Sequence, residues 1–212
     1  MKTIILSSSG FRTPQLQKDL LSLLPKTPSQ TKIAHVLTAS KVSPDRAFVE
    51  RERRVLSDLG FQVEEVDIEG KSPEELRNVL GSKDIIYVQG GNTFYLLKHV
   101  RESGFDTVVK DLIEKGAIYL GVSAGSYIAC PTIEMSTWGS SSDDHYGLTD
   151  LSAMKLVPFL VSVHYNREKY RQGLAEGIKA SKYPVKILTD EQALLIRDGE
   201  VKLIGSGEEV KL

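Results

Sequence analysis

The sequence is poor in the residues that identify a disulfide-rich, metal-binding or membrane protein. Among its 212 residues there is one cysteine, Cys130, which excludes an intramolecular disulfide and any multi-cysteine metal site. The 27 basic and 28 acidic residues nearly cancel, so the net charge of −1 favours neither nucleic acid nor an anionic membrane as a partner. No apolar run approaches the roughly 20 residues of a membrane-spanning helix, and the apolar segment after Met1 is too short for a signal peptide. We therefore expect a cytoplasmic protein, and the sequence leaves its oligomeric state open.

Short apolar runs alternate with helical patterns along most of the chain. Strands are predicted at residues 3–6, 32–37, 61–68, 84–88, 118–122, 157–165, 185–189, 193–197 and 201–204. Helices are predicted at residues 14–24, 44–60, 105–115, 124–130 and 167–181, and two more begin at residues 73 and 93. This β-α order predicts an α/β protein, with three α/β/α layers and a mostly parallel central sheet, built as a single domain over residues 1–212. The last two strands flank an Asp198-Gly199 turn and predict a C-terminal β-hairpin.

In parallel sheets, binding and catalytic sites form at the carboxyl ends of the strands. The residues that follow the predicted strands are therefore the first candidates for a functional site. The segment Val88-Gln-Gly-Gly-Asn-Thr93 follows a predicted strand, and its paired glycines allow a sharp turn and a close approach to a ligand. Free N–H groups in such a turn can bind an anion or an oxyanion. Asn92 and Thr93 are placed to hold a polar end of a substrate. The competing interpretation is a plain strand-to-helix turn with one of them as the helix cap.

A second strand end, Gly121-Val-Ser-Ala-Gly125, has the form of a nucleophile elbow. The two glycines relieve crowding at a sharp turn that exposes the Ser123 hydroxyl, and the N–H of Ala124 faces the same space. The alternative is that Ser123 is only the cap of the next helix. A serine hydroxyl needs a nearby base to act as a nucleophile, so the histidines decide between the two interpretations.

Of the four histidines, one ends a predicted strand. His35 lies within a strand, His99 within a helix and His145 in a polar loop. His164 follows the apolar run of a strand, so we expect it at the same sheet edge as Ser123 and favour it as the base.

Several acidic residues are candidates for the group that orients the histidine imidazole. Asp190 and Glu191 end a predicted strand, and Asp143 and Asp144 lie in the polar loop. In α/β-hydrolases the acid comes between the serine and the histidine in chain order, whereas the best order here places it after His164. An ordinary esterase of that fold is therefore disfavoured.

Two segments, YVQGGNTFYLL (87–97) and GVSAGSYIACPTI (121–133), closely resemble signatures of the peptidase E and cyanophycinase family of serine peptidases. The similarity extends to the β-α order along most of the chain. It implies a fold like that of class I glutamine amidotransferases, of flavodoxin-like type, in a cytoplasmic enzyme without metal or cofactor. Members similar to peptidase E remove an N-terminal aspartate from short peptides. Members similar to cyanophycinase cut β-aspartyl-arginine polymers.

The resemblance also implies roles for individual residues. Ser123 attacks a peptide carbonyl and His164 is its base. The N–H groups of Gly91 and Ala124 form the oxyanion hole. The expected partner is a short peptide substrate.

The chain departs from the family pattern at two places. Some members have an aspartate where this chain has Trp138, so the orienting role passes to Glu191. Cyanophycinase-like members carry Asp-Gln before the histidine, whereas this chain has Ser162-Val163, which argues against the polymer substrate. After the histidine, Arg167 and Arg171 are each able to bind a substrate carboxylate, although both also fit an exposed helix face.

Two further functions share this fold and these motifs. One is a non-catalytic small-molecule binding or sensor protein, which needs no base near Ser123. The other is an amidase or esterase that acts on small substrates. The loop at residues 135–150, rich in Ser, Gly and Asp, is expected to overhang the site and restrict it to short substrates. The sequence leaves open whether that loop is a lid.

Overall fold

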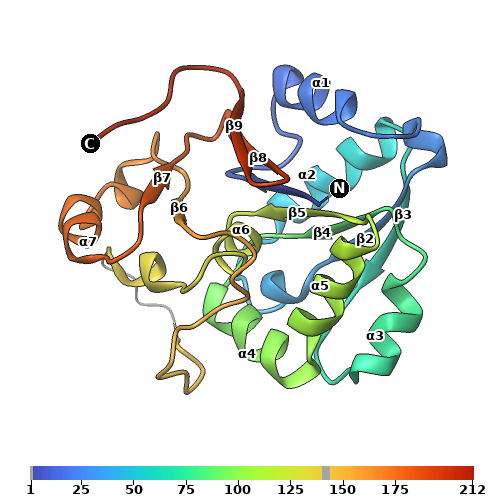
Figure 1. The fold of residues 1–212 in the computed structure, drawn as a ribbon, viewed down its shortest axis with the longest axis horizontal. Helices are drawn as coiled ribbons and strands as arrows, with labels where there is room; N and C mark the ends of the chain where they lie inside the picture. Colours follow the sequence, from blue (N-terminus) through green and yellow to red (C-terminus); the bar gives the residue numbers. More distant parts are fainter. Residues whose placement is uncertain (1, 140–143) are drawn as a thin grey trace.

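The computed structural model describes residues 2–139 and 144–212, and its centre is a seven-stranded sheet with the order β3-β2-β4-β5-β1-β8-β9 (Figure 1). The strands of the chain are β1 (Thr3–Ser7), β2 (Lys32–Val36), β3 (Gln62–Val66), β4 (Ile85–Val88), β5 (Ile118–Val122), β6 (Leu160–Ser162), β7 (Val185–Ile187), β8 (Gln192–Arg197) and β9 (Glu200–Gly205). From β3 to β1 all neighbours are parallel, whereas β8 is antiparallel to β1 and β9 to β8. The predicted mostly parallel sheet and C-terminal hairpin are confirmed.

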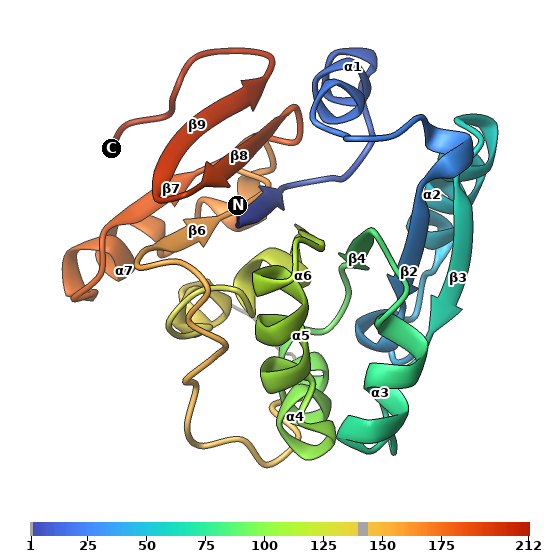
Figure 2. The same ribbon diagram turned by 45° about the vertical axis from the view of Figure 1, so that its right-hand side comes forward.

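Helices cover both faces of this sheet (Figure 2). They are α1 (Pro14–Ser22), α2 (Ala47–Asp58), α3 (Pro73–Leu80), α4 (Thr93–Ser103), α5 (Phe105–Glu114), α6 (Ala124–Tyr127) and α7 (Leu174–Ala180), with 3₁₀ turns η1 (Pro28–Gln30), η2 (Thr38–Ser40), η3 (Glu134–Thr137) and η4 (Glu168–Tyr170). Leu16 of α1 and Leu56 of α2 are buried with Ile5 and Tyr87 in one apolar cluster. A second, larger cluster contains the apolar faces of α3, α4 and α5. The two clusters are the two interfaces of a three-layer α/β/α fold, as predicted.

The local signals in the sequence account for where the helices begin. At α3, the Ser72 hydroxyl accepts from the N–H of Glu75 at 3.3 Å, and the Glu75 carboxylate accepts from the N–H of Ser72 at 2.8 Å. At α4, the Asn92 side chain accepts from the N–H of Tyr95 at 2.8 Å. Each contact satisfies a backbone donor that has no partner within the helix. These side chains fix the point at which the chain turns from strand end to helix.

The region after residue 150 differs most from the prediction. The strand expected at 157–165 is reduced to β6, and β6 pairs in parallel with β7 in a separate two-stranded sheet. The helix expected at 167–181 is divided into η4 and α7, because Gly173 between them adopts a φ of 67°. Short strands at residues 157–189 thus lie outside the central sheet.

The sheet register brings several loop residues to one edge. Ser7 at the end of β1 is opposite Val122 at the end of β5 and opposite Ala193 near the start of β8. The residues that follow β1 and β5 and precede β8 therefore lie beside one another. Within residues 2–139 and 144–212, no helix has the length and apolar character needed to cross a bilayer.

Candidate active site

Ser123 sits at a sharp turn between β5 and α6. Its backbone has φ 51° and ψ −108°, a conformation that non-glycine residues seldom adopt. The turn fits because both flanking glycines lack a side chain: a Cβ on Gly121 would lie 2.4 Å from the Gly125 carbonyl oxygen, and one on Gly125 would lie 2.1 Å from the Val88 carbonyl oxygen. Ser123 is therefore held in the geometry of a nucleophile elbow rather than in that of an ordinary helix cap.

Replacing Gly125 by Ala is expected to lower the free energy of unfolding by about 1–3 kcal/mol, because the methyl group would overlap the Val88 carbonyl. Helix propensity alone would predict the opposite change in the free energy of unfolding, because Ala is more favourable than Gly within a helix. Urea unfolding of the variant measures the change. The matched control is Gly139→Ala, where the nearest atom is 3.5 Å from the added Cβ. Equal stability of the two variants would contradict the steric argument.

His164 lies within hydrogen-bond distance of Ser123. The Ser123 hydroxyl and His164 Nε2 are 3.0 Å apart. His164 is buried, its φ is 61°, and the ring of Tyr170 packs on its imidazole at a centroid distance of 4.8 Å. The pair predicted from the sequence is thus brought together, at a distance that permits proton transfer.

The carboxylate on the other side of the imidazole belongs to Asp190, and this corrects the expectation for Glu191. Asp190 Oδ1 accepts a hydrogen bond from His164 Nδ1, and Asp190 is buried. Glu191 is exposed, and its N–H points back to the Thr189 hydroxyl at 3.4 Å. The N–H of Gln192 donates to the Thr189 carbonyl at 3.1 Å, so Asp190 and Glu191 are the two central residues of a turn, and of the two only Asp190 contacts His164.

Further contacts hold Asp190 in its ionised form. Arg167 Nε donates to Asp190 Oδ2 at 2.7 Å, and Ser8 Oγ donates to Asp190 Oδ1 at 3.2 Å. Burial by itself would raise the pKa of Asp190, but the contacts with His164 and Arg167 outweigh it and hold that pKa well below its usual range. Ser8 also accepts from the backbone N–H of His164 at 2.9 Å, so it fixes the histidine and the carboxylate together.

Two backbone N–H groups near Ser123 are left without acceptors. Among the described residues, neither Gly91 N–H nor Ala124 N–H donates to another group, whereas the next N–H, of Asn92, donates to Ala39 O at 2.9 Å. Gly91 has a φ of 146°, and a Cβ there would lie 2.1 Å from the Ala39 carbonyl oxygen. Glycine is required at this position, and its free N–H suits an oxyanion.

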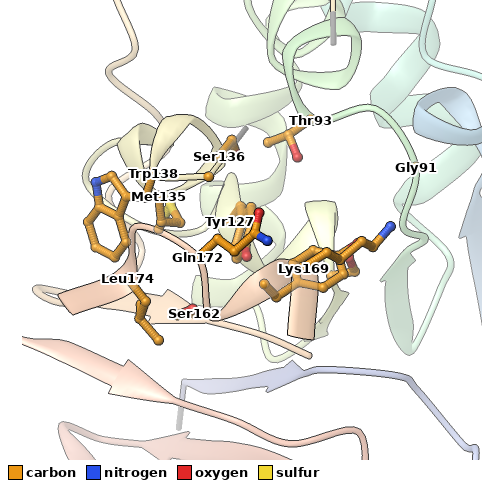
Figure 3. A pocket seen from close by; sticks show the side chains of 13 residues that line it. Gly91, Thr93, Tyr127, Met135, Ser136, Trp138, Ser162, Lys169, Gln172 and Leu174 are labelled. Carbon is orange, nitrogen blue, oxygen red and sulfur yellow. The ribbon is translucent and has the colours of Figure 1, made fainter. Parts of the chain in front are cut away.

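Two cavities meet at Ser123. The smaller, the Trp138 cavity, has a volume of about 300 Å³ and includes the side chains of Tyr127, Met135, Trp138 and Leu174 in its wall (Figure 3). The larger, the Gln89 cavity, has a volume of about 480 Å³ and includes His164, Gln89 and Glu52. The two share the wall residues Gly91, Ser123, Lys169 and Tyr170. A peptide carbonyl at Ser123 would thus have space on both sides.

The four residues expected to bind substrate are placed differently. Asn92 borders the Gln89 cavity and Thr93 the Trp138 cavity, although the Asn92 side chain also caps α4. Arg167 borders the Gln89 cavity but is paired with Asp190. Arg171 borders neither cavity, and its guanidinium lies 5.9 Å from the ring centroid of Tyr165.

The described part of the loop at residues 135–150 packs on helices near the site. The indole of Trp138 lies over Gly177 of α7, and His145 stacks on Phe94 of α4 with 4.1 Å between ring centroids. Asp144 accepts from the N–H of Tyr146 at 2.8 Å. Asp143, the other loop aspartate proposed from the sequence, lies outside the described residues.

The remaining histidines are buried in the fold. His35 Nε2 lies 3.2 Å from Gln89 Oε1, and burial lowers the pKa of His35 to about 4. His99 lies on α4 against the ring of Tyr95. In the part of the chain that the structure describes, no group of three or more His, Cys, Asp or Glu side chains is arranged to hold a metal ion.

Sequence reasoning missed several residues around Ser123. Ser8 follows β1 at the same edge, and the order of the strands would have been needed to select it. Ser136, Lys169 and Tyr170 come from turns, where no periodic pattern shows which side chains point inward.

Comparisons with known proteins identify the family and the fold. A model of peptidase family S51 matches residues 3–204. The uncharacterized peptidase Lmo0363 of Listeria monocytogenes is 32% identical over 206 residues, 95% of this chain and 97% of the relative. Peptidase E of Nostoc sp. is 29% identical over 189 residues, 84% of this chain and 74% of the relative. A crystal structure of a candidate peptidase E protein from Listeria monocytogenes superposes with a TM-score of 0.86 at 29% identity, over 98% of this chain and 100% of that chain.

Proposed function

The chain belongs to peptidase family S51, and from that premise we propose that this serine-type peptidase hydrolyses short peptides at an N-terminal aspartate through Ser123, His164 and Asp190. The observation that carries the proposal is the hydrogen-bonded chain from Ser123 Oγ to His164 Nε2, at 3.0 Å, and from His164 Nδ1 to Asp190 Oδ1. This arrangement has the roles of nucleophile, base and orienting acid in the right order.

In the first half of the reaction, Ser123 Oγ attacks the carbonyl carbon while its proton passes to His164 Nε2. The carbonyl oxygen becomes an oxyanion, and the free N–H groups of Gly91 and Ala124 stabilise it. The imidazolium then gives its proton to the leaving amine, the C–N bond breaks, and the acyl group remains on Ser123 as an ester. Asp190 stabilises the imidazolium and keeps Nδ1 protonated, so that Nε2 faces the serine.

In the second half, a water molecule attacks the ester carbonyl and loses a proton to His164 Nε2. The tetrahedral intermediate uses the same two N–H groups. Its collapse breaks the bond to Ser123 Oγ, which recovers a proton from the imidazolium. The enzyme returns to its starting state without a metal or cofactor.

Substrate length and identity follow from the surroundings of Ser123. Residues of η3 and α7 line the Trp138 cavity, which has a volume of about 300 Å³. This limited volume favours a substrate whose first residue has a small side chain. The relatives named peptidase E support cleavage after an N-terminal aspartate, and Ser162-Val163 before His164 argues against a β-aspartyl polymer. An amidase or esterase would use the same machinery, whereas a binding protein would need neither His164 nor Asp190 in hydrogen-bond contact.

A substrate panel tests the proposal. We expect α-aspartyl dipeptides to be cleaved faster than β-aspartyl dipeptides, neutral dipeptides and simple esters. A serine-directed phosphonate should label Ser123, as read by peptide mass mapping. Labelling of Ser123 without cleavage of any peptide would favour the alternative function, an esterase or amidase. Absence of both labelling and cleavage would contradict a catalytic role for Ser123.

The rate should decline on the acid side only below the ordinary pKa of histidine. Burial lowers the pKa of His164 from 6.5, Arg167 and Lys169 act in the same direction, and the contact with Asp190 opposes them. A protonated imidazole cannot accept the Ser123 proton, so kcat/KM should fall as pH falls through this lowered pKa. Measurement of kcat/KM between about pH 4 and about pH 9 gives the position of the fall. A midpoint above 6.5 would be inconsistent with the buried environment of His164.

A further inference from the structure

The segment 165–173, directly after His164, carries three cations, and two of them are engaged with other groups. Both Nε and Nη2 of Arg167 lie 2.7 Å from Asp190 Oδ2, so this guanidinium serves the orienting acid. Arg171 lies over the ring of Tyr165 and borders neither cavity at Ser123. Lys169, in the η4 turn between them, borders both cavities. The cation available to a substrate from this segment is therefore Lys169.

The ammonium group of Lys169 lacks a carboxylate partner. Within residues 2–139 and 144–212, no Asp or Glu oxygen lies within 4.0 Å of its Nζ. Nζ lies 4.8 Å from the ring centroid of Tyr170, the residue that packs on His164. In Figure 3 the Lys169 side chain extends toward the loop that carries Gly91. The charge thus borders both cavities that meet at Ser123, without a carboxylate to neutralise it.

The Trp138 cavity has an electrostatic character that suits an anion. Among its described wall residues, Lys169 is the one with a charged side chain, and there is no carboxylate. Hydroxyl groups of Thr93, Ser136 and Ser162 also lie in this wall. Ser136 Oγ is buried and has no hydrogen-bond partner among the described residues, which is costly for a hydroxyl unless a ligand supplies the partner.

We propose that Lys169 and Ser136 form a subsite for a substrate carboxylate in the Trp138 cavity, an inference that rests on the proposed peptidase function. Lys169 supplies the charge and Ser136 a hydrogen-bond donor. The carboxylate has two sources in an aspartyl dipeptide, the side chain of the first residue and the C-terminus. Both present the same group to the subsite, and the peptides used in the test distinguish them.

Arg51, a second cation without an ion-pair partner among the described residues, borders the Gln89 cavity and not the Trp138 cavity. Asp45 and Glu52 also line that cavity, beside Arg167 and Lys169, so its wall carries acidic as well as basic side chains. A substrate carboxylate placed there would meet like charges as well as Arg51. The neutral wall and single cation of the Trp138 cavity make it the better site.

The experiment measures binding rather than turnover, so it is separate from the test of the proposed function. Calorimetric titration of the inactive Ser123→Ala protein uses Asp-Leu, Asn-Leu and Asp-Leu amide. Adding Lys169→Met should weaken binding of the peptides that present the recognised carboxylate by about 10-fold or more, and Lys169→Arg should restore most of it. Ser136→Ala should give a smaller loss. Lys179→Met, an exposed lysine on α7 outside both cavities, is the matched control and should change nothing.

The pattern of losses decides the outcome. A loss confined to Asp-Leu and its amide supports the subsite with the side-chain carboxylate as ligand. A loss confined to Asp-Leu and Asn-Leu supports it with the C-terminal carboxylate. Equal losses for all three peptides, no loss for any, or no binding by the Ser123→Ala protein itself would overturn the proposal. Carboxylate-dependent binding by a protein whose wild-type form cleaves no peptide would leave the subsite standing and refute the proposed function.

Discussion

Replacement of Ser123 by Ala is expected to reduce kcat for peptide hydrolysis by about 10⁴–10⁶-fold while the protein stays folded. The hydroxyl is the group that forms the ester with the acyl part of the substrate, and among the described residues no other hydroxyl forms a hydrogen bond with His164 Nε2. Within the described part of the chain, the Ser123 side chain makes one hydrogen bond, to His164, so its removal takes little from the packing. Steady-state kinetics and circular dichroism of the purified variant measure both effects.

The control for this variant is Ser57→Ala, an exposed serine on α2 that should keep full activity. A Ser123→Ala protein with more than about a hundredth of the wild-type rate would contradict nucleophilic catalysis by this residue. Loss of the circular dichroism signal would instead assign Ser123 a structural role at the elbow.

Replacement of Asp190 by Asn is expected to lower kcat by about 10⁴-fold, as loss of the orienting acid does in other serine peptidase triads. An amide can present its NH₂ group to His164 Nδ1, which moves the ring proton to Nε2 and removes the acceptor for the Ser123 proton. The variant also loses the ion pair with Arg167, so KM and thermal stability are recorded with kcat.

Glu191→Gln is the matched control, because it makes the same chemical change one residue further along. Glu191 is exposed and does not contact His164, so its variant should keep the wild-type rate within about 2-fold. A large loss with Glu191→Gln and a small one with Asp190→Asn would reverse the assignment made from the structure and return the role to Glu191.

The sequence alone predicted the structure correctly where a short local pattern is compatible with a single backbone conformation. A strand followed by Gly-x-Ser-x-Gly demands a turn in which neither glycine tolerates a side chain, and Gly121 and Gly125 are in contact with backbone carbonyl groups. The capping box at Ser72 and the Asn92 cap likewise act through residues three positions apart. His164 was expected beside Ser123 as the end of a strand in the same sheet. The two residues are 3.0 Å apart, although β6, the strand before His164, pairs with β7 outside the central sheet.

The choice between adjacent residues needed the tertiary structure. Asp190 and Glu191 have the same chemistry and are the two central residues of one turn, so which of them faces His164 depends on how that turn is oriented. The orientation is fixed by contacts distant in sequence: Ser9 Oγ donates to the Asp190 carbonyl, and Ser8 N–H donates to Gln192 O at 3.2 Å. No pattern within residues 185–192 contains this information.

The same limit applies to the cations after His164. A regular helix would have placed Arg167 and Arg171 on one face, one turn apart, and both were expected to face the substrate. The chain instead forms the short η4 turn, which ends at Tyr170, and α7 begins only after Gly173. In this arrangement Arg167 contacts Asp190, and Lys169 lies in the walls of both cavities. The sequence by itself determined the layered fold and the elbow, because these depend on local stereochemistry and strand order. The tertiary structure alone decided which acid and which cation face the site, because those directions depend on contacts between segments far apart in the chain.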